Sequence, residues 1–147
     1  MPPAQNVHVG VGAIVERRDH GLLLVQRGSR ESYAHGFGKW GLPGGWLEFG
    51  ETAYDAARRE VLEETGIFVR PFRPEHFTTR TEGTSDLHIV TLFVRCEYLG
   101  GELQNREPDK QMQVAWIRQE YLTELDLFAP LDAWWKSPIA SRDAMAH

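Results

Sequence analysis

The chain has 147 residues, of which 41% are hydrophobic and 25% are charged, and these proportions are typical of one soluble globular domain with its own core. The formal net charge of -5 argues against a broad surface for nucleic acid polymers, because such surfaces are basic. It does not exclude a small anionic substrate. The single cysteine, Cys96, allows no internal disulfide and is expected to be a small core residue.

The sequence contains no segment that favours a membrane. Its longest aliphatic run, Leu22 to Val25, is far too short to span one, and the N-terminal residues lack the apolar centre of a signal peptide. We therefore expect a cytoplasmic protein with no membrane partner. We expect residues 1–136 to form a single domain, and residues 137–147, which are largely polar, to form a flexible C-terminal tail.

The first elements in chain order are predicted to be strands. Val7 to Glu16 alternates with a period of two, and Gly10 and Gly12 within it would let a neighbouring backbone approach closely. Leu22 to Gln26 is a short apolar run. The two segments are therefore predicted to form a hairpin around the polar turn Arg17 to Gly21.

Two basic residues and a loop precede the next feature. Arg27 ends the second strand and could clamp a phosphate with its planar guanidinium, although a surface arginine fits the pattern equally well. Glu31 to Gly38 is predicted to be a loop. Lys39 could help to hold a polyphosphate, but an exposed lysine is the default expectation. Pro43 and the glycine pair after it predict a tight turn, where Gly45 could offer its carbonyl to a ligand.

A helix of about four turns is predicted between two clear end signals. Thr52, followed three residues later by Asp55, resembles a capping box and gives the helix a defined beginning. Gly66 stands where a left-handed C-terminal cap would lie.

Three glutamates crowd onto one side of this helix. At about 100° per residue, Glu60, Glu63 and Glu64 fall within an arc of about 100°. Like charges at this spacing weaken a helix, and a solvated acidic face is the ordinary explanation for such a pattern. Small residues lie on or near the same face: Ala53, Ala56 and Ala57. Because they favour close approach of another backbone, a hard divalent cation held by oxygen ligands becomes the better interpretation.

Three strands are predicted directly after the helix. Ile67 to Phe72 is expected to be short and to end in a turn marked by Pro71 and Pro74. His76 to Glu82 and Leu87 to Tyr98 are expected to pair around a turn at residues 83–86. The second of this pair is apolar on both faces, as a central strand should be.

The C-terminal part predicts one strand and two short helices. The strand, Val114 to Arg118, is centred on Trp116, and the helices are expected at Glu120 to Leu122 and at Leu127 to Trp135. Trp134 and Trp135 look exposed in the sequence, which is compatible with an interface between subunits.

The segment from Gly45 to Ile67 resembles the signature of the Nudix hydrolase family. That signature is a glycine, five residues, a glutamate, seven residues, and then Arg-Glu-(aliphatic)-x-Glu-Glu-x-Gly-(aliphatic). The chain supplies every specified position at this spacing: Gly45, Glu51, Arg59, Glu60, Val61, Glu63, Glu64, Gly66 and Ile67. The resemblance implies an α/β fold, namely a Nudix-type α/β/α sandwich with a central mixed sheet and the signature as a loop-helix-loop. It also implies a homodimer.

The resemblance implies a metal site as well. Glu60 and Glu64 would be the main ligands of Mg²⁺ or Mn²⁺, together with the Gly45 carbonyl. Glu63 would be a further ligand or the general base, since this assignment differs among relatives.

Around the metal site, Arg59 would orient the carboxylates through a salt bridge, with Glu51 as its partner. Glu107, in the stretch Glu-Pro-Asp-Lys, would be an extra metal ligand or a pocket acid. Trp116 could pack near the base of a nucleotide, although a core tryptophan is the more frequent finding. Trp46 replaces a histidine that similar proteins usually carry, and its indole could stack on a base or cover the sheet.

Outside the signature, the first 120 residues or so resemble one branch of the family. Vertebrate enzymes of that branch hydrolyse modified purine nucleoside triphosphates, and a similar plant enzyme also acts on a prenyl diphosphate. The main hypothesis is therefore Mg²⁺-dependent hydrolysis of a nucleoside triphosphate, including oxidised or modified purine forms, to a monophosphate and pyrophosphate. The partner would then be a small nucleotide or diphosphate.

Two alternatives remain open at this point. The chain could hydrolyse another X-linked diphosphate, such as a nucleotide sugar, a dinucleoside polyphosphate or a prenyl diphosphate. It could also be a domain that senses nucleotides without cleaving them. Such domains usually lose glutamates from the signature, whereas this chain keeps all three of its clustered glutamates.

Overall fold

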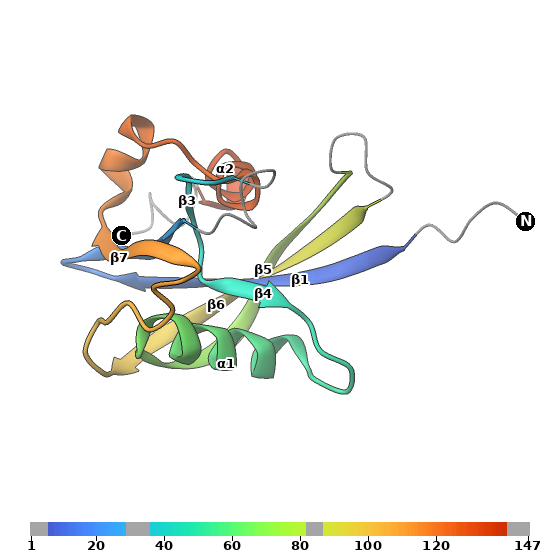
Figure 1. Ribbon diagram of the computed structural model, residues 1–147, viewed down its shortest axis with the longest axis horizontal. Coiled ribbons are helices and arrows are strands. Elements are labelled where there is room, and N and C mark those ends of the chain that lie inside the picture. Colours follow the sequence, from blue (N-terminus) through green and yellow to red (C-terminus); the bar gives the residue numbers. More distant parts are fainter. Residues whose placement is uncertain (1–5, 29–35, 82–86, 141–147) are drawn as a thin grey trace, which may run out of the picture.

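The computed structural model describes residues 6–28, 36–81 and 87–140. The elements in chain order are β1 (Val7–Arg17), β2 (Gly21–Arg27), β3 (Trp40–Gly41), β4 (Gly44–Trp46), α1 (Ala53–Thr65), β5 (Phe68–Thr81), β6 (His88–Gly100), β7 (Gln111–Ile117), the 3-10 helix η2 (Gln119–Glu124) and α2 (Ala129–Trp135). The sheet lies between α1 on one face and η2 with α2 on the other (Figure 1). The predicted α/β/α sandwich is therefore confirmed. No helix in the described ranges is long and apolar enough to cross a membrane.

The sheet is mixed, because β1 and β6 run parallel while the other pairs are antiparallel. Its strand order is β3-β2-β1-β6-β5, with β4 also pairing with β1 and β7 with β2. The predicted hairpin of β1 and β2 is confirmed at its closed end, where Glu16 faces Leu22 and Arg17 faces Gly21. Beyond these two pairs the strands part. β1 then takes β4 as its neighbour, and β2 takes β3 and β7.

The prediction of two strands separated by a proline turn is wrong. Residues 68–81 form one strand, β5, whose register against β6 shifts at Pro71 and again at Pro74. Proline is tolerated here because β5 is the last strand of the sheet, where one side of the backbone needs no ladder partner. β6 lies between β1 and β5, so its predicted central position is confirmed. The turn predicted at residues 83–86 lies outside the described residues.

The close backbone approach expected at Gly10 and Gly12 occurs at another glycine. A side chain at Gly10 would meet only ordinary contacts, at 3.8 Å, so no backbone crowds this position. The close approach occurs instead at Gly44, where a Cβ would overlap the Val11 carbonyl oxygen. The tight turn predicted around Pro43 is also absent, since Pro43 is a bend between the short strands β3 and β4.

The helix α1 has the predicted ends and the predicted close packing. Oγ1 of Thr52 accepts a hydrogen bond from the Asp55 amide at 3.1 Å, and Gly66 adopts the left-handed conformation, with φ of 76°. Ala56 and Ala57 are fully buried against the sheet. Small side chains therefore let α1 lie close to the strands above it.

A buried polar network fixes α2 on the opposite face. Trp134 is completely buried, and its Nε1 donates to the Glu75 carboxylate at 2.6 Å. Arg95 also donates to Glu75, through Nε and Nη2. The expectation of an exposed Trp134 is therefore wrong, because its ring fills the core beneath α2.

Residues 137–140, which the sequence suggested were part of a flexible tail, are packed against the domain. Ser137 and Ala140 are buried, and Oγ of Ser137 donates to the Trp134 carbonyl at 2.6 Å. Residues 137–140 therefore continue the packed structure rather than leave it. Residues 141–147 lie outside the described part of the chain.

We predict that Trp134→Phe lowers the free energy of unfolding by about 1.5–3 kcal/mol, because it removes a hydrogen bond to a buried carboxylate. Urea denaturation monitored by circular dichroism measures this loss. Trp135→Phe is the matched control, since Trp135 is only partly buried, and it should cost about 0.5 kcal/mol. Equal losses in the two variants would contradict the importance of the network.

Candidate active site

The described residues form a pocket of about 530 Å³, a size that suits a small-molecule ligand. It lies where β1 and β2 part, since both strands contribute to its lining. Charged and aromatic side chains reach it from several elements: Arg27, Trp46, Glu60, Glu64, Glu107 and Lys110. The pocket therefore brings together residues from four separate parts of the sequence.

Glu64, in the last turn of α1, is held at the wall of this pocket. Its Oε2 accepts a hydrogen bond from the Gly44 amide at 2.8 Å, and its backbone carbonyl accepts one from Nε2 of Gln111 at 2.7 Å. Burial raises the pKa of the Glu64 carboxyl well above its usual range, and the neighbouring Glu60 raises it further. The site therefore holds an acidic group in surroundings that disfavour its charge.

Glu60 lies one helical turn before Glu64 and faces the same pocket. A Cβ added at Gly45 would lie only 2.5 Å from Oε1 of Glu60. The Glu60 carboxylate can therefore occupy its position only because residue 45 has no side chain. Burial raises the pKa of Glu60, although the hydrogen bond from Arg59 works in the opposite direction.

Arg59 is the centre of a group of carboxylates. Its Nε and Nη2 donate to the two oxygens of Glu51 at 2.6 and 2.9 Å, and Nη1 donates to Glu60 at 2.9 Å and to Glu63 at 3.3 Å. The hydrogen bond from Arg59 lowers the pKa of Glu51. The same bond raises the pKa of Arg59, so the guanidinium stays charged. The salt bridge expected between Arg59 and the carboxylates is present.

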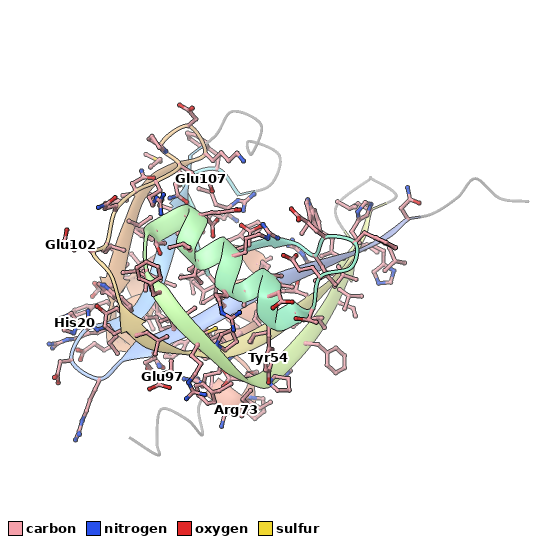
Figure 2. All side chains as sticks on the ribbon, turned by 90° about the horizontal axis from the view of Figure 1, so that it is seen from below. His20, Tyr54, Arg73, Glu97, Glu102 and Glu107 are labelled. Carbon is pink, nitrogen blue, oxygen red and sulfur yellow. The ribbon has the colours of Figure 1, made fainter. Side chains whose placement is uncertain are left out.

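Three of the residues predicted outside the helix do reach the pocket. Arg27 lies with its guanidinium 4.2 Å from the ring centre of Phe128. Trp46 is 51% exposed and lies beside His8, with ring centres 5.4 Å apart. Glu107 reaches the pocket from the segment before β7. Figure 2 shows it near one end of α1, while Tyr54 lies at the other end.

Five of the predicted site residues do not line the pocket, and two of them, Glu51 and Arg59, form the ion pair described above. Lys39 approaches Asp126, at 4.0 Å, and Glu63 is half exposed beside Arg59. Trp116 packs edge-on against Tyr98, with ring centres 5.7 Å apart, on the α1 side of the sheet. Trp116 is partly buried against the core on that side, and its position outside the pocket lining does not support a contact with a base.

The sequence analysis missed several pocket residues. Arg80 and Thr91 come from β5 and β6, and Phe128 from the residue before α2. None carries a motif signal, because only the folded sheet brings them together. Lys110 could have been found, since it lies three residues after Glu107 and approaches its carboxylate at 3.6 Å.

The donor chemistry of the pocket fits a hard divalent cation. Glu60 and Glu64 offer carboxylate oxygens, and Glu107 is near enough for its charge to raise the pKa of both. Within the described residues, however, no three His, Cys, Asp or Glu side chains converge as in a closed metal site. Two carboxylates, the backbone carbonyl of Gly45 and the nearby Glu107 are therefore the groups of this pocket that could hold a cation.

This arrangement combines an acidic wall with basic side chains. Carboxylates can hold a cation, while Arg27 and Lys110 line the same pocket and can bind phosphate oxygens. Such a pocket suits a polyphosphate that is bound as its metal complex.

Comparisons with known proteins agree with this arrangement. A model of the NUDIX domain matches residues 6–139. A MutT-like protein of Streptomyces ambofaciens is 34% identical over 123 residues, which cover 84% of this chain and 70% of that protein. An 8-oxo-dGDP phosphatase of Danio rerio is 32% identical over 114 residues, covering 76% of this chain but 32% of that longer protein.

The fold is also found among solved structures. A MutT protein of Methanosarcina mazei superposes with a TM-score of 0.77 over 95% of this chain and 96% of that one, at 19% sequence identity. The domain match covers nearly the whole described chain, and it includes the complete signature from Gly45 to Ile67. The chain therefore belongs to the Nudix hydrolase family, whose members cleave phosphoric anhydride bonds.

Proposed function

We propose that the chain hydrolyses a nucleoside triphosphate to the monophosphate and pyrophosphate, in a reaction that depends on Mg²⁺ or Mn²⁺. Oxidised or otherwise modified purine forms belong to the proposed substrates. The observation that carries the proposal is the pairing of Glu60 and Glu64 on one wall of a pocket that also presents Arg27 and Lys110. The name of the Danio rerio relative, an 8-oxo-dGDP phosphatase, supports a purine nucleotide.

In this proposal Glu60, Glu64 and the Gly45 carbonyl hold the cation, and Glu107 supplies a further oxygen. A bound cation offsets charge on the phosphate oxygens and lowers the pKa of the attacking water. Arg27 and Lys110 bind the phosphates that the cation leaves exposed. Their position on the pocket lining supports this role.

Arg59 is proposed as a positioning residue, because it donates to Glu51, Glu60 and Glu63 at once. Glu51 accepts two hydrogen bonds from Arg59 and one from the Glu48 amide, so both of its oxygens are engaged. Glu63 is bound to Arg59 through Oε2 only. We keep both proposed roles for Glu63, a further ligand or the general base, and it lies beside Arg59 rather than on the pocket lining.

We also propose a cytoplasmic homodimer. Three exposed phenylalanines on the edge strand β5 support a subunit interface there: Phe68, Phe72 and Phe77. Residues 6–139 would form the single domain of each subunit.

We predict that Glu64→Gln lowers kcat for pyrophosphate release at least about a hundredfold, the scale on which one positioned electrostatic group accelerates an enzyme. The hydrogen bond from the Gly44 amide can persist with the amide oxygen, so the fold should remain. Released pyrophosphate in the presence of Mg²⁺ is the measurement. Glu102→Gln, at an exposed position outside the pocket, is the control. Near-normal turnover of Glu64→Gln would overturn the metal assignment.

The same variant has an expected effect on stability. A buried carboxyl whose pKa is raised destabilises the folded state when it is ionised, by about 1.4 kcal/mol for each pKa unit. This penalty is present above the raised pKa and disappears as the pH falls toward the ordinary value of 4.5. In metal-free protein, Glu64→Gln should therefore be more stable than wild type near neutral pH, and the difference should shrink as the pH is lowered.

Urea denaturation in the presence of a chelator measures this difference between about pH 8 and about pH 5. Adding Mg²⁺ should then stabilise the wild type and leave Glu64→Gln nearly unchanged, because only a ligand bound to the folded state raises stability. An equal effect of Mg²⁺ on both proteins would contradict the role of Glu64 as a ligand.

A substrate panel decides between the nucleoside triphosphate and other diphosphates. We expect the highest kcat/KM for a purine nucleoside triphosphate, with monophosphate and pyrophosphate as the separated products. The panel should contain dGTP, its 8-oxo form, a nucleotide sugar, a dinucleoside polyphosphate and a prenyl diphosphate. A clear preference for any of the last three would replace the proposed reaction with hydrolysis of an X-linked diphosphate.

A further inference from the structure

Gly10 forms part of the pocket floor. It lies on the sheet face that α2 covers, between two neighbouring strands, and it pairs with Trp46 of β4 and with Thr91 of β6. Gly12, two residues further along β1, lies on the same face and also lines the pocket. Two positions of a central strand thus present bare backbone to the pocket.

Neither the backbone nor the packing requires a glycine at position 10. Gly10 does not belong to the glycines of the described residues that have a positive φ. A Cβ at this position would lie 3.8 Å from the Gly45 carbonyl oxygen, from Oγ1 of Thr91 and from the Trp46 ring, which are ordinary contacts. Glycine also weakens a strand, because it loses more backbone freedom than other residues and adds no side chain to the packing.

Gly44 and Gly45 differ from Gly10 in what a side chain would meet there. At Gly44 a Cβ would overlap the Val11 carbonyl oxygen, and at Gly45 it would collide with the Glu60 carboxylate. Protein atoms therefore exclude a side chain at these two glycines. At Gly10 the space that a side chain would fill is part of the pocket instead.

The surroundings of this space suit a flat ring. The Trp46 indole borders it and is half exposed, and Phe128 contributes a second aromatic ring to the same pocket. Aromatic side chains hold nucleobases by stacking, and a floor without side chains lets a ring approach the sheet. A methyl group on the floor would project toward such a ring.

We propose that Gly10 determines substrate specificity, by leaving room on the pocket floor for the nucleobase beside Trp46. This inference rests on the proposed function, since it takes the substrate to be a nucleotide. Its selectivity would act on the base and not on the phosphates, because Glu60 and Glu64 lie on another element, α1, and a Cβ at Gly10 would meet the Gly45 carbonyl oxygen only at an ordinary 3.8 Å.

The test compares wild type, Gly10→Ala and Gly10→Val on dGTP and on the abasic 2′-deoxyribose 5′-triphosphate. We expect Gly10→Ala to raise KM for dGTP by at least about tenfold, the usual effect of one misplaced methylene, while kcat changes little. Gly10→Val should raise it further. Neither variant should alter KM for the abasic triphosphate, and their Tm should equal or exceed that of wild type.

Gly41→Ala is the matched control, because it adds a methyl to another strand glycine, which contacts Phe128 at an ordinary 3.5 Å and does not line the pocket. It should keep the KM of wild type. An unchanged KM for dGTP in Gly10→Ala would overturn the proposal. Equal increases for dGTP and the abasic compound would overturn it too, since the methyl would then disturb the site as a whole.

Binding of dGMP separates this inference from the proposed function. If wild type released no pyrophosphate from any triphosphate, the proposed function would be wrong. The dGMP dissociation constants from calorimetry would still show whether Gly10 leaves room for the nucleobase. A Kd at least about tenfold weaker in Gly10→Ala than in wild type supports the base site. An equal Kd, or no binding of dGMP to wild type, overturns it.

Discussion

Strands β1 and β2 are joined by two residue pairs at the closed end of their hairpin, and beyond those pairs each strand has different neighbours. This separation opens the sheet on the side of the pocket, because a continuous ladder between the two strands would fill the space with backbone. It also leaves β4 free to pair with β1 and to run directly above α1. The pocket, the glycine floor and the contact between β4 and α1 all depend on it.

Close packing of α1 against β4 places two carboxylates next to each other in surroundings that disfavour their charge. Glu64 accepts a hydrogen bond from the Gly44 amide, and Glu60 touches the backbone at Gly45, so both acids are partly removed from water next to each other. Burial raises both pKa values. Arg59 compensates only in part, because it also binds Glu51 and Glu63. The fold therefore keeps a local instability that a bound cation would relieve.

The sequence predicted those parts of the site that depend on local geometry. The caps at Thr52 and Gly66 and the burial of Ala56 and Ala57 follow from helical spacing and from the end signals. Trp116 shows the opposite case. Its place in the chain allowed a base contact, although a core position was the more frequent finding, and only the folded sheet, in which β7 pairs with β2 and the indole packs edge-on against Tyr98, places it outside the pocket lining. The single strand β5 was missed because prolines suggest a turn, unless the strand is known to be an edge.

In the proposed function, cation binding and base recognition would rest largely on different elements of this fold. The acidic residues lie on α1 and on the segment before β7, where they are positioned by the helix and by Gln111, which ties β7 to Glu64. The floor lies on β1 and β6, which pair in parallel within the sheet. A change of side chain at Gly10 alters the space for the base without touching a carboxylate. If Gly10 has the proposed role, substrate preference could change at the floor while the carboxylates of the acidic wall stay the same, and a complete signature alone would then not fix the base.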